Sequence, residues 1–336
     1  MAVDDKLVAE IEQLTARLSQ ARESVEQRFV GQKSVVEQVL AAILSGGHAL
    51  LVGQPGLGKT MLVDTLATVL GLDNARIQFT PDLMPADILG SEVLDVKPDG
   101  TRAFRFIEGP VFTQLLMADE INRASPRTQS ALLQAMQEGE VTISGQHRPL
   151  GRPFHVLATQ NPIEQEGTYP LPEAQLDRFL LQVDVGYPDR DTERAILLAT
   201  TGTDQGAPHA VFDAQGLVAA QALIRRMPVG ETVLNAVLDL VRSARPEAPE
   251  APEAPDWLAE ALVWGPGPRA AQALMMVTRA RAVLQGRFAP TLDDVTAMAA
   301  PVLRHRIALS FAARARGESV DALISRLLGD RMQAAA

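Results

Sequence analysis

The chain has 336 residues and a formal net charge of −10, with 46% hydrophobic and 21% charged residues. This length and composition favour one large or two modest globular domains and exclude wholesale disorder, collagen-like and coiled-coil classes. No cysteine is present, which excludes disulfide frameworks, cysteine-ligated zinc, iron–sulfur clusters and a cysteine nucleophile. The acidic balance disfavours nucleic-acid binding, because such binding depends on Lys and Arg neutralising phosphates.

The first residues lack a basic stretch followed by an apolar one, so we expect no signal peptide. No apolar run approaches the length of a membrane-spanning helix. We therefore expect a soluble, cytoplasmic protein with no membrane span.

Apolar residues recur every three or four positions over residues 6–28 and 35–44, which predicts two amphipathic helices. From residue 48 to about 200, short apolar runs alternate with helical patterns. We expect strands at 48–52, 76–79, 115–118, 154–159 and 180–185, and helices at 61–70, 126–137 and 189–200. This alternation predicts an α/β domain with a largely parallel sheet.

Two segments interrupt the alternation. Residues 80–110 contain two short strand patterns, 92–96 and 103–107, joined by the turn sequence Lys97-Pro98-Asp99-Gly100. Residues 139–152 contain two more, 141–144 and 147–150, on either side of Gly145. We expect both segments to be hairpin insertions that project from the sheet.

After about residue 205 the pattern becomes helical, with helices expected at 217–226, 232–244, 269–285 and 292–311. Between them, residues 245–256 have proline at every third position, which is typical of an extended surface loop. The sequence therefore predicts an N-terminal helix (1–28), an α/β domain (29–204) and a small all-helical domain with a C-terminal tail (205–336).

The sequence of residues 53–60, Gly-Gln-Pro-Gly-Leu-Gly-Lys-Thr, matches the pattern G-x-x-x-x-G-K-[ST] between an expected strand and an expected helix. Glycines let successive backbone N–H groups point at phosphate oxygens, and the helix N-terminus adds positive potential. Lys59 can reach the β- and γ-phosphates, and the Thr60 hydroxyl can bind Mg²⁺. A glycine-rich turn that only caps a helix is the alternative.

A carboxylate pair, Asp119-Glu120, follows the apolar run 115–118. Open α/β sheets bind ligands at the carboxyl ends of their strands, so the pair is expected beside the phosphates. Asp119 would hold the Mg²⁺ shell, and Glu120 would polarise the attacking water. The alternative is a solvated acidic pair at a strand end.

Several segments resemble the AAA+ ATPases: the loop at 53–60 (Walker A), the run Asp119-Glu120-Ile121-Asn122-Arg123 (Walker B) and the sequence 158–162, Ala-Thr-Gln-Asn-Pro. The segment 171–179, Leu-Pro-Glu-Ala-Gln-Leu-Asp-Arg-Phe, and Pro268-Arg269-Ala270 are similar to the MoxR branch. The resemblance extends from about residue 29 to about 315. It implies a P-loop NTPase domain followed by a helical lid.

The resemblance also implies further site residues. Val30-Gly31-Gln32 would pack on adenine, Asn161 would orient the lytic water, and Arg178 would reach the γ-phosphate of a neighbouring subunit. Arg269 would be the second sensor, coupling nucleotide state to the lid angle, and Arg123 and Arg127 are further candidates for facing the next protomer. The alternatives are a turn-forming Asn161 and an ion pair of Arg178 with Asp177 or Glu173.

The expected ATP-binding residues are Gly31, Gln32, Gly53, Pro55, Gly56, Leu57, Gly58, Lys59, Thr60, Met61 and Asp119, with Thr60 and Asp119 holding Mg²⁺. The residues expected to act in hydrolysis are Lys59, Glu120, Asn161, Arg178 and Arg269.

The resemblance implies an ATPase that forms a ring, most often a hexamer, and remodels or matures a partner complex in a chaperone-like manner, often for metal insertion. It also implies a partner protein with a von Willebrand factor A domain. One alternative is an activase for a single metabolic enzyme, such as a Rubisco or a nitric oxide reductase. The others are a nucleic-acid motor, disfavoured by the charge, and a nucleotide-gated scaffold with little turnover.

Overall fold

The computed structural model describes residues 5–96, 102–164, 167–201, 207–246 and 256–335, with the side chains of Asp5, Asp256 and 330–335 left aside. Its centre is a five-stranded, wholly parallel sheet in the order β2-β5-β8-β1-β9. The strands are β1 (Ala49–Val52), β2 (Asn74–Gln78), β5 (Leu115–Asp119), β8 (His155–Gln160) and β9 (Leu181–Asp184). The parallel sheet predicted from the alternating pattern is confirmed.

Both faces of the three inner strands, β5, β8 and β1, are buried, because their residues alternate between two apolar clusters. Leu115 and Met117 of β5 join the cluster that contains α1, α2 and α3, whereas Leu116 and Ala118 join the cluster beneath α5. This two-residue period is the pattern of a sheet covered by helices on both sides. The helices of these two clusters include α1 (Asp5–Arg28), α2 (Lys33–Leu44), α3 (Lys59–Leu70), α4 (Pro85–Leu89) and α5 (Pro126–Glu138).

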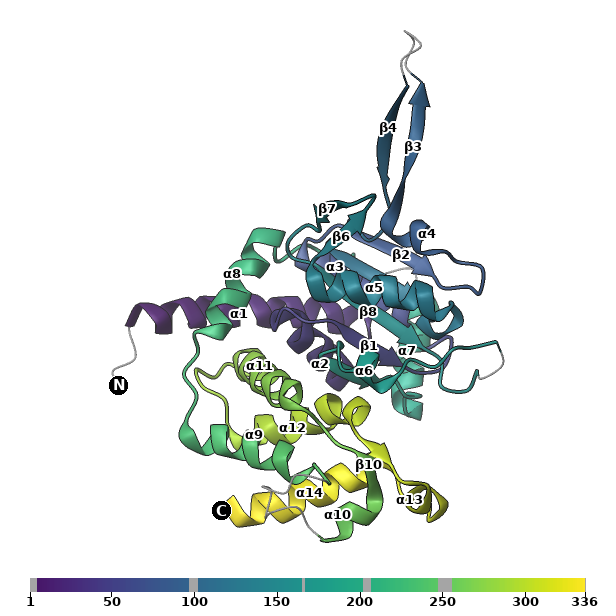
Figure 1. The fold of residues 1–336 in the computed structure, drawn as a ribbon. Helices are drawn as coiled ribbons and strands as arrows, with labels where there is room; N and C mark the ends of the chain where they lie inside the picture. Colours follow the sequence, from purple (N-terminus) through teal and green to yellow (C-terminus); the bar gives the residue numbers. More distant parts are fainter. Residues whose placement is uncertain (1–4, 97–101, 165–166, 202–206, 247–255, 336) are drawn as a thin grey trace.

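Two antiparallel hairpins extend from the same end of this domain (Figure 1). The longer pairs β3 (Gly90–Val96) with β4 (Arg102–Glu108), and the shorter pairs β6 (Glu140–Ile143) with β7 (Gln146–Pro149). They lie within the two segments expected to hold insertions, although the turn at 97–100 falls outside the described residues. Arg148 joins the hairpins, because its guanidinium stacks 3.9 Å from the Phe106 ring centroid and lies 3.6 Å from Glu92.

The C-terminal part is mainly helical and lies at the opposite end from the hairpins (Figure 1). It contains α9 (Glu231–Ser243), α10 (Asp256–Ala261), α11 (Pro268–Leu284), α12 (Leu292–Leu303), α13 (Phe311–Ala315) and α14 (Val320–Ala335), with a small sheet of β10 (Leu262–Trp264) and β11 (Ala308–Leu309). In the described part of the chain, no helix is long and apolar enough to cross a membrane. The expected loop at 245–256 lies almost wholly outside the described residues.

The helix expected over 292–311 is wrong beyond residue 303. Residues Arg304–Arg306 form a 3₁₀ helix, η2, and the chain then pairs with β10 through β11 before α13 begins. Side chains on η2 reach distant acids: Arg304 contacts Asp184 at 3.1 Å, and Arg306 contacts Asp177 at 2.7 Å. These tertiary contacts override the local helical pattern.

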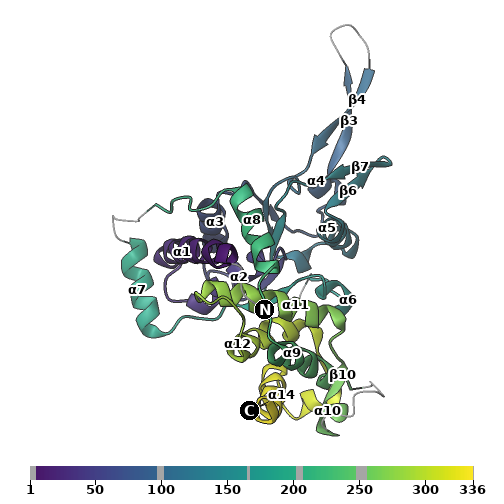
Figure 2. The ribbon, with the colours of Figure 1, turned by 90° about the vertical axis from the view of Figure 1, so that its left-hand side faces the viewer.

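Two further helices occupy positions that matter for the site. Helix α7 (Arg190–Thr201) stands apart from the sheet, whereas α8 (Ala214–Arg225) lies beside α1 (Figure 2). Helix α8 contacts α1, α2 and α11, although the sequence assigned it to the second domain. The boundary at residue 205 stays a prediction.

Two buried histidines link these elements. The His48 Nδ1 accepts from Val156 N and its Nε2 donates to Met136 O, while the His155 Nδ1 donates to Gly47 O and its Nε2 accepts from Gln221. Each ring therefore uses one nitrogen as donor and one as acceptor, which requires the neutral form. Burial lowers the pKa of His48 to about 3 and that of His155 to about 4.

These histidines predict acid sensitivity. Well above the unperturbed histidine pKa of about 6.5, both are neutral in the folded and unfolded chains. As the pH falls from about 6.5 toward 4, the two histidines become protonated in the unfolded chain but stay neutral in the folded chain. The free energy of unfolding therefore falls, by roughly 1 kcal/mol per histidine at pH 5.5. Urea unfolding at pH 7.5 and 5.5 measures this loss. His209→Gln, at an exposed position, is expected to leave it unchanged, and a pH-independent free energy of unfolding would contradict the assignment.

Candidate functional site

The loop between β1 and α3 has the backbone shape that a phosphate requires. Gly56 (φ 82°) and Gly58 (φ 74°) adopt left-handed conformations, and a Cβ on Gly58 would approach the Phe29 ring to 3.2 Å. Helix α3 begins at Lys59 with Gly58 as its N-cap, and no side chain caps it. Its first N–H groups therefore remain available to an anion at the loop.

Lys59 lies across this loop. Its Nζ donates to Gly53 O at 2.7 Å and to Gln54 O at 2.6 Å. Burial lowers the pKa of Lys59, while the nearby Asp119 and Glu120 carboxylates oppose that shift. An ammonium has three N–H donors, so one remains for a further acceptor.

The acidic pair ends β5 beside the loop. Asp119 accepts from Thr159 Oγ1 and from Arg76 Nη2, both at 2.5 Å, and the Glu120 carboxylate accepts from Gln78 at 2.8 Å and from Arg123 at 3.0 Å. Both carboxylates are partly buried and partnered, unlike a solvated pair.

Glu120 has a φ of 55°, the left-handed conformation that a residue with a side chain rarely adopts. Its N–H donates to Thr159 Oγ1 at 2.8 Å, which helps to hold this turn. Backbone strain of this kind collects at functional sites.

The sequence did not single out Arg76, Gln78 or Thr159. Arg76 and Gln78 are two residues apart on β2, so both side chains project to one face, and β2 is the neighbour of β5. Their spacing of two residues indicates that both side chains lie on the same face of a strand. That they contact Asp119 and Glu120 becomes evident only once β2 is known to be the neighbour of β5.

A cavity of about 510 Å³ brings most of the expected phosphate and metal residues together. Its lining includes Gly53, the run Pro55–Met61, Asp119, Glu120 and Asn161. Asn161 also serves its local turn, since its Oδ1 accepts from Ile163 N at 3.2 Å and its Nδ2 donates to Glu164 at 3.3 Å. Both interpretations of Asn161 therefore have support: it lines the cavity and it stabilises the turn.

A second cavity, of about 530 Å³, adjoins the first through Pro55–Gly58 and Met61. Its apolar lining comes from Phe29, Val30, Ile196 and Leu197, and Gln32 contributes an amide. It suits a flat, apolar base with polar edges.

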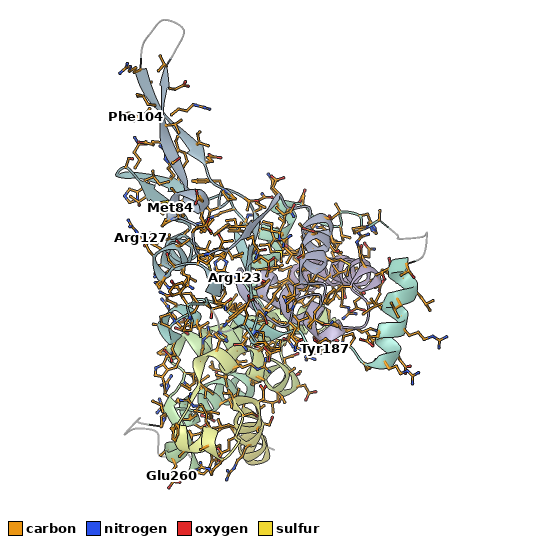
Figure 3. All side chains as sticks on the ribbon, turned by 90° about the vertical axis from the view of Figure 1, so that its right-hand side faces the viewer. Met84, Phe104, Arg123, Arg127, Tyr187 and Glu260 are labelled. Atoms are coloured by element: carbon orange, nitrogen blue, oxygen red, sulfur yellow. The ribbon has the colours of Figure 1, made fainter. Side chains whose placement is uncertain are left out.

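Gly31 does not line this cavity. It has a φ of 82°, and a Cβ there would lie 2.1 Å from Thr192 Cγ2, so it allows the close approach of α7. Tyr187, labelled in Figure 3, does line this cavity and donates its hydroxyl to Gln54.

Arg178 and Arg269 line neither of these cavities. Both line a third one, of about 240 Å³, together with Asp177 and Arg306. Asp177 pairs with Arg306 at 2.7 Å and Arg269 at 3.7 Å, and within the described residues Arg178 forms no ion pair with Asp177 or Glu173. The intramolecular alternative for Arg178 is therefore not found.

Arg123 and Arg127 differ from each other. Arg123 donates a hydrogen bond to the Glu120 carboxylate, and this bond raises the pKa of Arg123. Arg127 is exposed at the start of α5, below Met84 and the hairpin residue Phe104 on one side of the domain (Figure 3).

Comparison with known proteins agrees with this geometry. A profile of the family described as "ATPase family associated with various cellular activities (AAA)" matches residues 48–181, and one described as "AAA lid domain" matches 257–327. Chaperone MoxR1 of Mycobacterium tuberculosis is 40% identical over 93% of this chain and 81% of its own length. The chain belongs to the MoxR family of AAA+ ATPases.

Matches to two other proteins extend over nearly the whole length of both chains. Protein MoxR of Paracoccus denitrificans is 33% identical over 92% of this chain and 94% of its own. The crystal structure of a candidate ATPase from Cytophaga hutchinsonii superposes with a TM-score of 0.85 at 36% identity, covering 96% of each chain. The predicted fold class, a parallel-sheet AAA+ domain followed by a helical lid, is confirmed.

The Lys59 geometry predicts that Lys59→Ala weakens ATP binding about tenfold or more, because a charged hydrogen bond to a buried phosphate contributes roughly 1.5–3 kcal/mol. Calorimetric titration with ATP and Mg²⁺ measures the affinity. Lys33→Ala, at an exposed lysine outside the cavities, serves as the control. An affinity of Lys59→Ala within twofold of wild type would show that the loop does not bind phosphate.

Proposed function

We propose that this chain is a Mg²⁺-dependent ATPase that converts ATP and water to ADP and phosphate between the subunits of a ring. The family resemblance favours a hexamer. One observation carries the proposal: Lys59, Asp119 and Glu120 meet at one cavity, whereas Arg178 and Arg269 line another. A single chain thus offers a phosphate site and, separately, arginines for a second phosphate site.

Each residue of the phosphate cavity has a proposed role. The loop amides and Lys59 bind the β- and γ-phosphates, Thr60 and Asp119 hold Mg²⁺, and Asn161 orients the attacking water. Bound Mg²⁺ supplies neutralisation of phosphate charge. Arg76 donates to one oxygen of Asp119 and Thr159 to the other, and each oxygen keeps a lone pair that would bind the metal or its water.

Glu120 is the proposed activator of water. Gln78 and Arg123 both donate to its Oε2, which fixes the orientation of the carboxylate and leaves Oε1 to accept a hydrogen bond from the water. The adenine is proposed to occupy the apolar cavity at Val30 and Gln32, with Gly31 fixing the adjacent helix.

Hydrolysis is proposed to drive chaperone-like remodelling or maturation of a partner complex in the cytoplasm, and metal insertion is one such task. A protein with a von Willebrand factor A domain is the proposed partner in this work. The exposed apolar residues Leu94, Val96 and Phe104 on the long hairpin support a protein client. Charges of both signs on this hairpin, such as Asp95 and Arg105, favour a protein over a nucleic acid.

For Glu120→Gln we expect turnover to fall by roughly 10² or more while ATP binding persists, because only help to the attacking water is lost. Phosphate release and ATP affinity are measured on the same preparation. Glu12→Gln, an exposed change on α1, is the control. Turnover near the wild-type rate would falsify the role of Glu120.

The trans role of Arg178 predicts complementation. Arg178→Ala keeps an intact phosphate cavity, and Glu120→Gln keeps an intact arginine, so mixed rings contain sites with both. Each variant alone is expected to be nearly inactive, and their mixture to regain phosphate release. If native mass spectrometry shows mixed assemblies without any gain in turnover, Arg178 does not act across subunits.

A further inference from the structure

The segment that carries Arg178 is held by the lid. Residues 177–180 connect α6 (Glu173–Leu176) to β9, and η2 contacts both of these elements. Arg306 on η2 is only 2% exposed. A guanidinium at such a depth is costly unless its N–H groups are paired.

All five N–H groups of Arg306 donate hydrogen bonds. Nε reaches Asp177 Oδ1 at 2.7 Å, Nη2 reaches Asp177 O at 3.3 Å and Phe179 O at 2.8 Å, and Nη1 reaches Leu180 O at 3.2 Å and Val302 O at 2.6 Å. These are all the donors that a guanidinium has. Four of the bonds reach the 177–180 segment, and the fifth returns to α12. Arg306 therefore fastens a lid helix to the residues on both sides of Arg178.

His305 strengthens the same attachment. Its Nε2 donates to Phe179 O at 3.0 Å, so that carbonyl accepts from both His305 and Arg306. Burial and the neighbouring Arg306 hold the pKa of His305 well below its usual value, which keeps the ring neutral.

The attachment also orients Arg269. One oxygen of Asp177 binds Arg306, and the other lies 3.7 Å from Arg269 Nη1. The third cavity thus gathers three arginines, at 178, 269 and 306, around the single carboxylate of Asp177. The surplus positive charge suits an anion, and the half-exposed Arg269 side chain is able to reach one.

We propose that Arg306 is a positioning residue, which sets the 177–180 segment so that Arg178 and Arg269 together meet the terminal phosphate of ATP bound to a neighbouring copy of this chain. Arg306 is buried and acts only through that segment. The proposal rests on the trans role proposed above for Arg178. It makes the lid, through one side chain, a determinant of hydrolysis in the adjacent subunit.

The first test uses Arg306→Gln. We expect ATP affinity within about twofold of wild type, because the phosphate cavity is elsewhere, and turnover at saturating ATP reduced roughly tenfold or more, a part of the 10³–10⁵ that an arginine finger supplies. Arg304→Gln is the matched control, since Arg304 lies on the same 3₁₀ helix but binds Asp184 and Asp321. It is expected to retain turnover. Wild-type turnover in Arg306→Gln would overturn the proposal.

Mixing experiments separate positioning from general damage. Arg306→Gln retains Lys59 and Glu120, so mixing it with Glu120→Gln is expected to restore phosphate release. Mixing it with Arg178→Ala is expected to restore none, because neither protein supplies a positioned arginine. Absence of recovery with Glu120→Gln, or recovery with Arg178→Ala, would overturn the proposal.

The mixture of Arg178→Ala with Glu120→Gln, run in parallel, tests the underlying trans role. If that mixture recovers and Arg306→Gln with Glu120→Gln does not, Arg306 has only a structural role. If neither recovers, the trans role of Arg178 itself fails. Should Arg306→Gln not assemble, Arg306→Lys takes its place in every mixture, since it retains the charge but lacks the planar five-donor fork.

Discussion

The structure depends on the parallel alignment of β1, β5 and β8. Parallel strands bring their carboxyl ends to one edge of a sheet, and here those ends carry the glycine-rich loop at 53–60, the Asp119-Glu120 pair and Asn161. Residues as far apart in the chain as Gly53 and Asn161 thereby line one cavity. Burial of both faces makes this register costly to change, because a one-residue slip would exchange the two apolar clusters.

Arg178 lies away from this cavity, although it is also close to a strand of the sheet. The residue lies just before β9, on the segment that η2 and α12 hold through Arg306. The proposed phosphate site thus lies at the sheet edge, and the arginines lie at a junction between sheet and lid. Under the proposed trans role, a change in lid angle in one subunit would move the arginines that reach the next one.

The parts of the site that the sequence predicted are those encoded locally. The loop at 53–60 and the pair at 119–120 are contiguous motifs, and hairpin turns are specified by a few adjacent residues. Arg76, Gln78 and Thr159 could not be found in this way, because their roles depend on which strands are neighbours.

Arg306 illustrates the same limit. The local pattern placed it inside a helix, whereas an ion pair with Asp177, 129 positions earlier, places it in a 3₁₀ turn. Tertiary contacts of this kind override helix propensity, which is a weak local preference. The family resemblance supplied the expected roles of Arg178 and Arg269, and the separate cavity that holds them came only from the three-dimensional arrangement.

The central claim is that one chain binds ATP and two chains hydrolyse it. It is tested most directly by measuring turnover per chain over a wide range of protein concentrations, with sedimentation and ATP binding followed on the same samples. The account predicts that isolated chains bind ATP with almost no turnover and that turnover rises with the assembled fraction. Isolated chains that hydrolyse ATP as fast as assembled ones would contradict it.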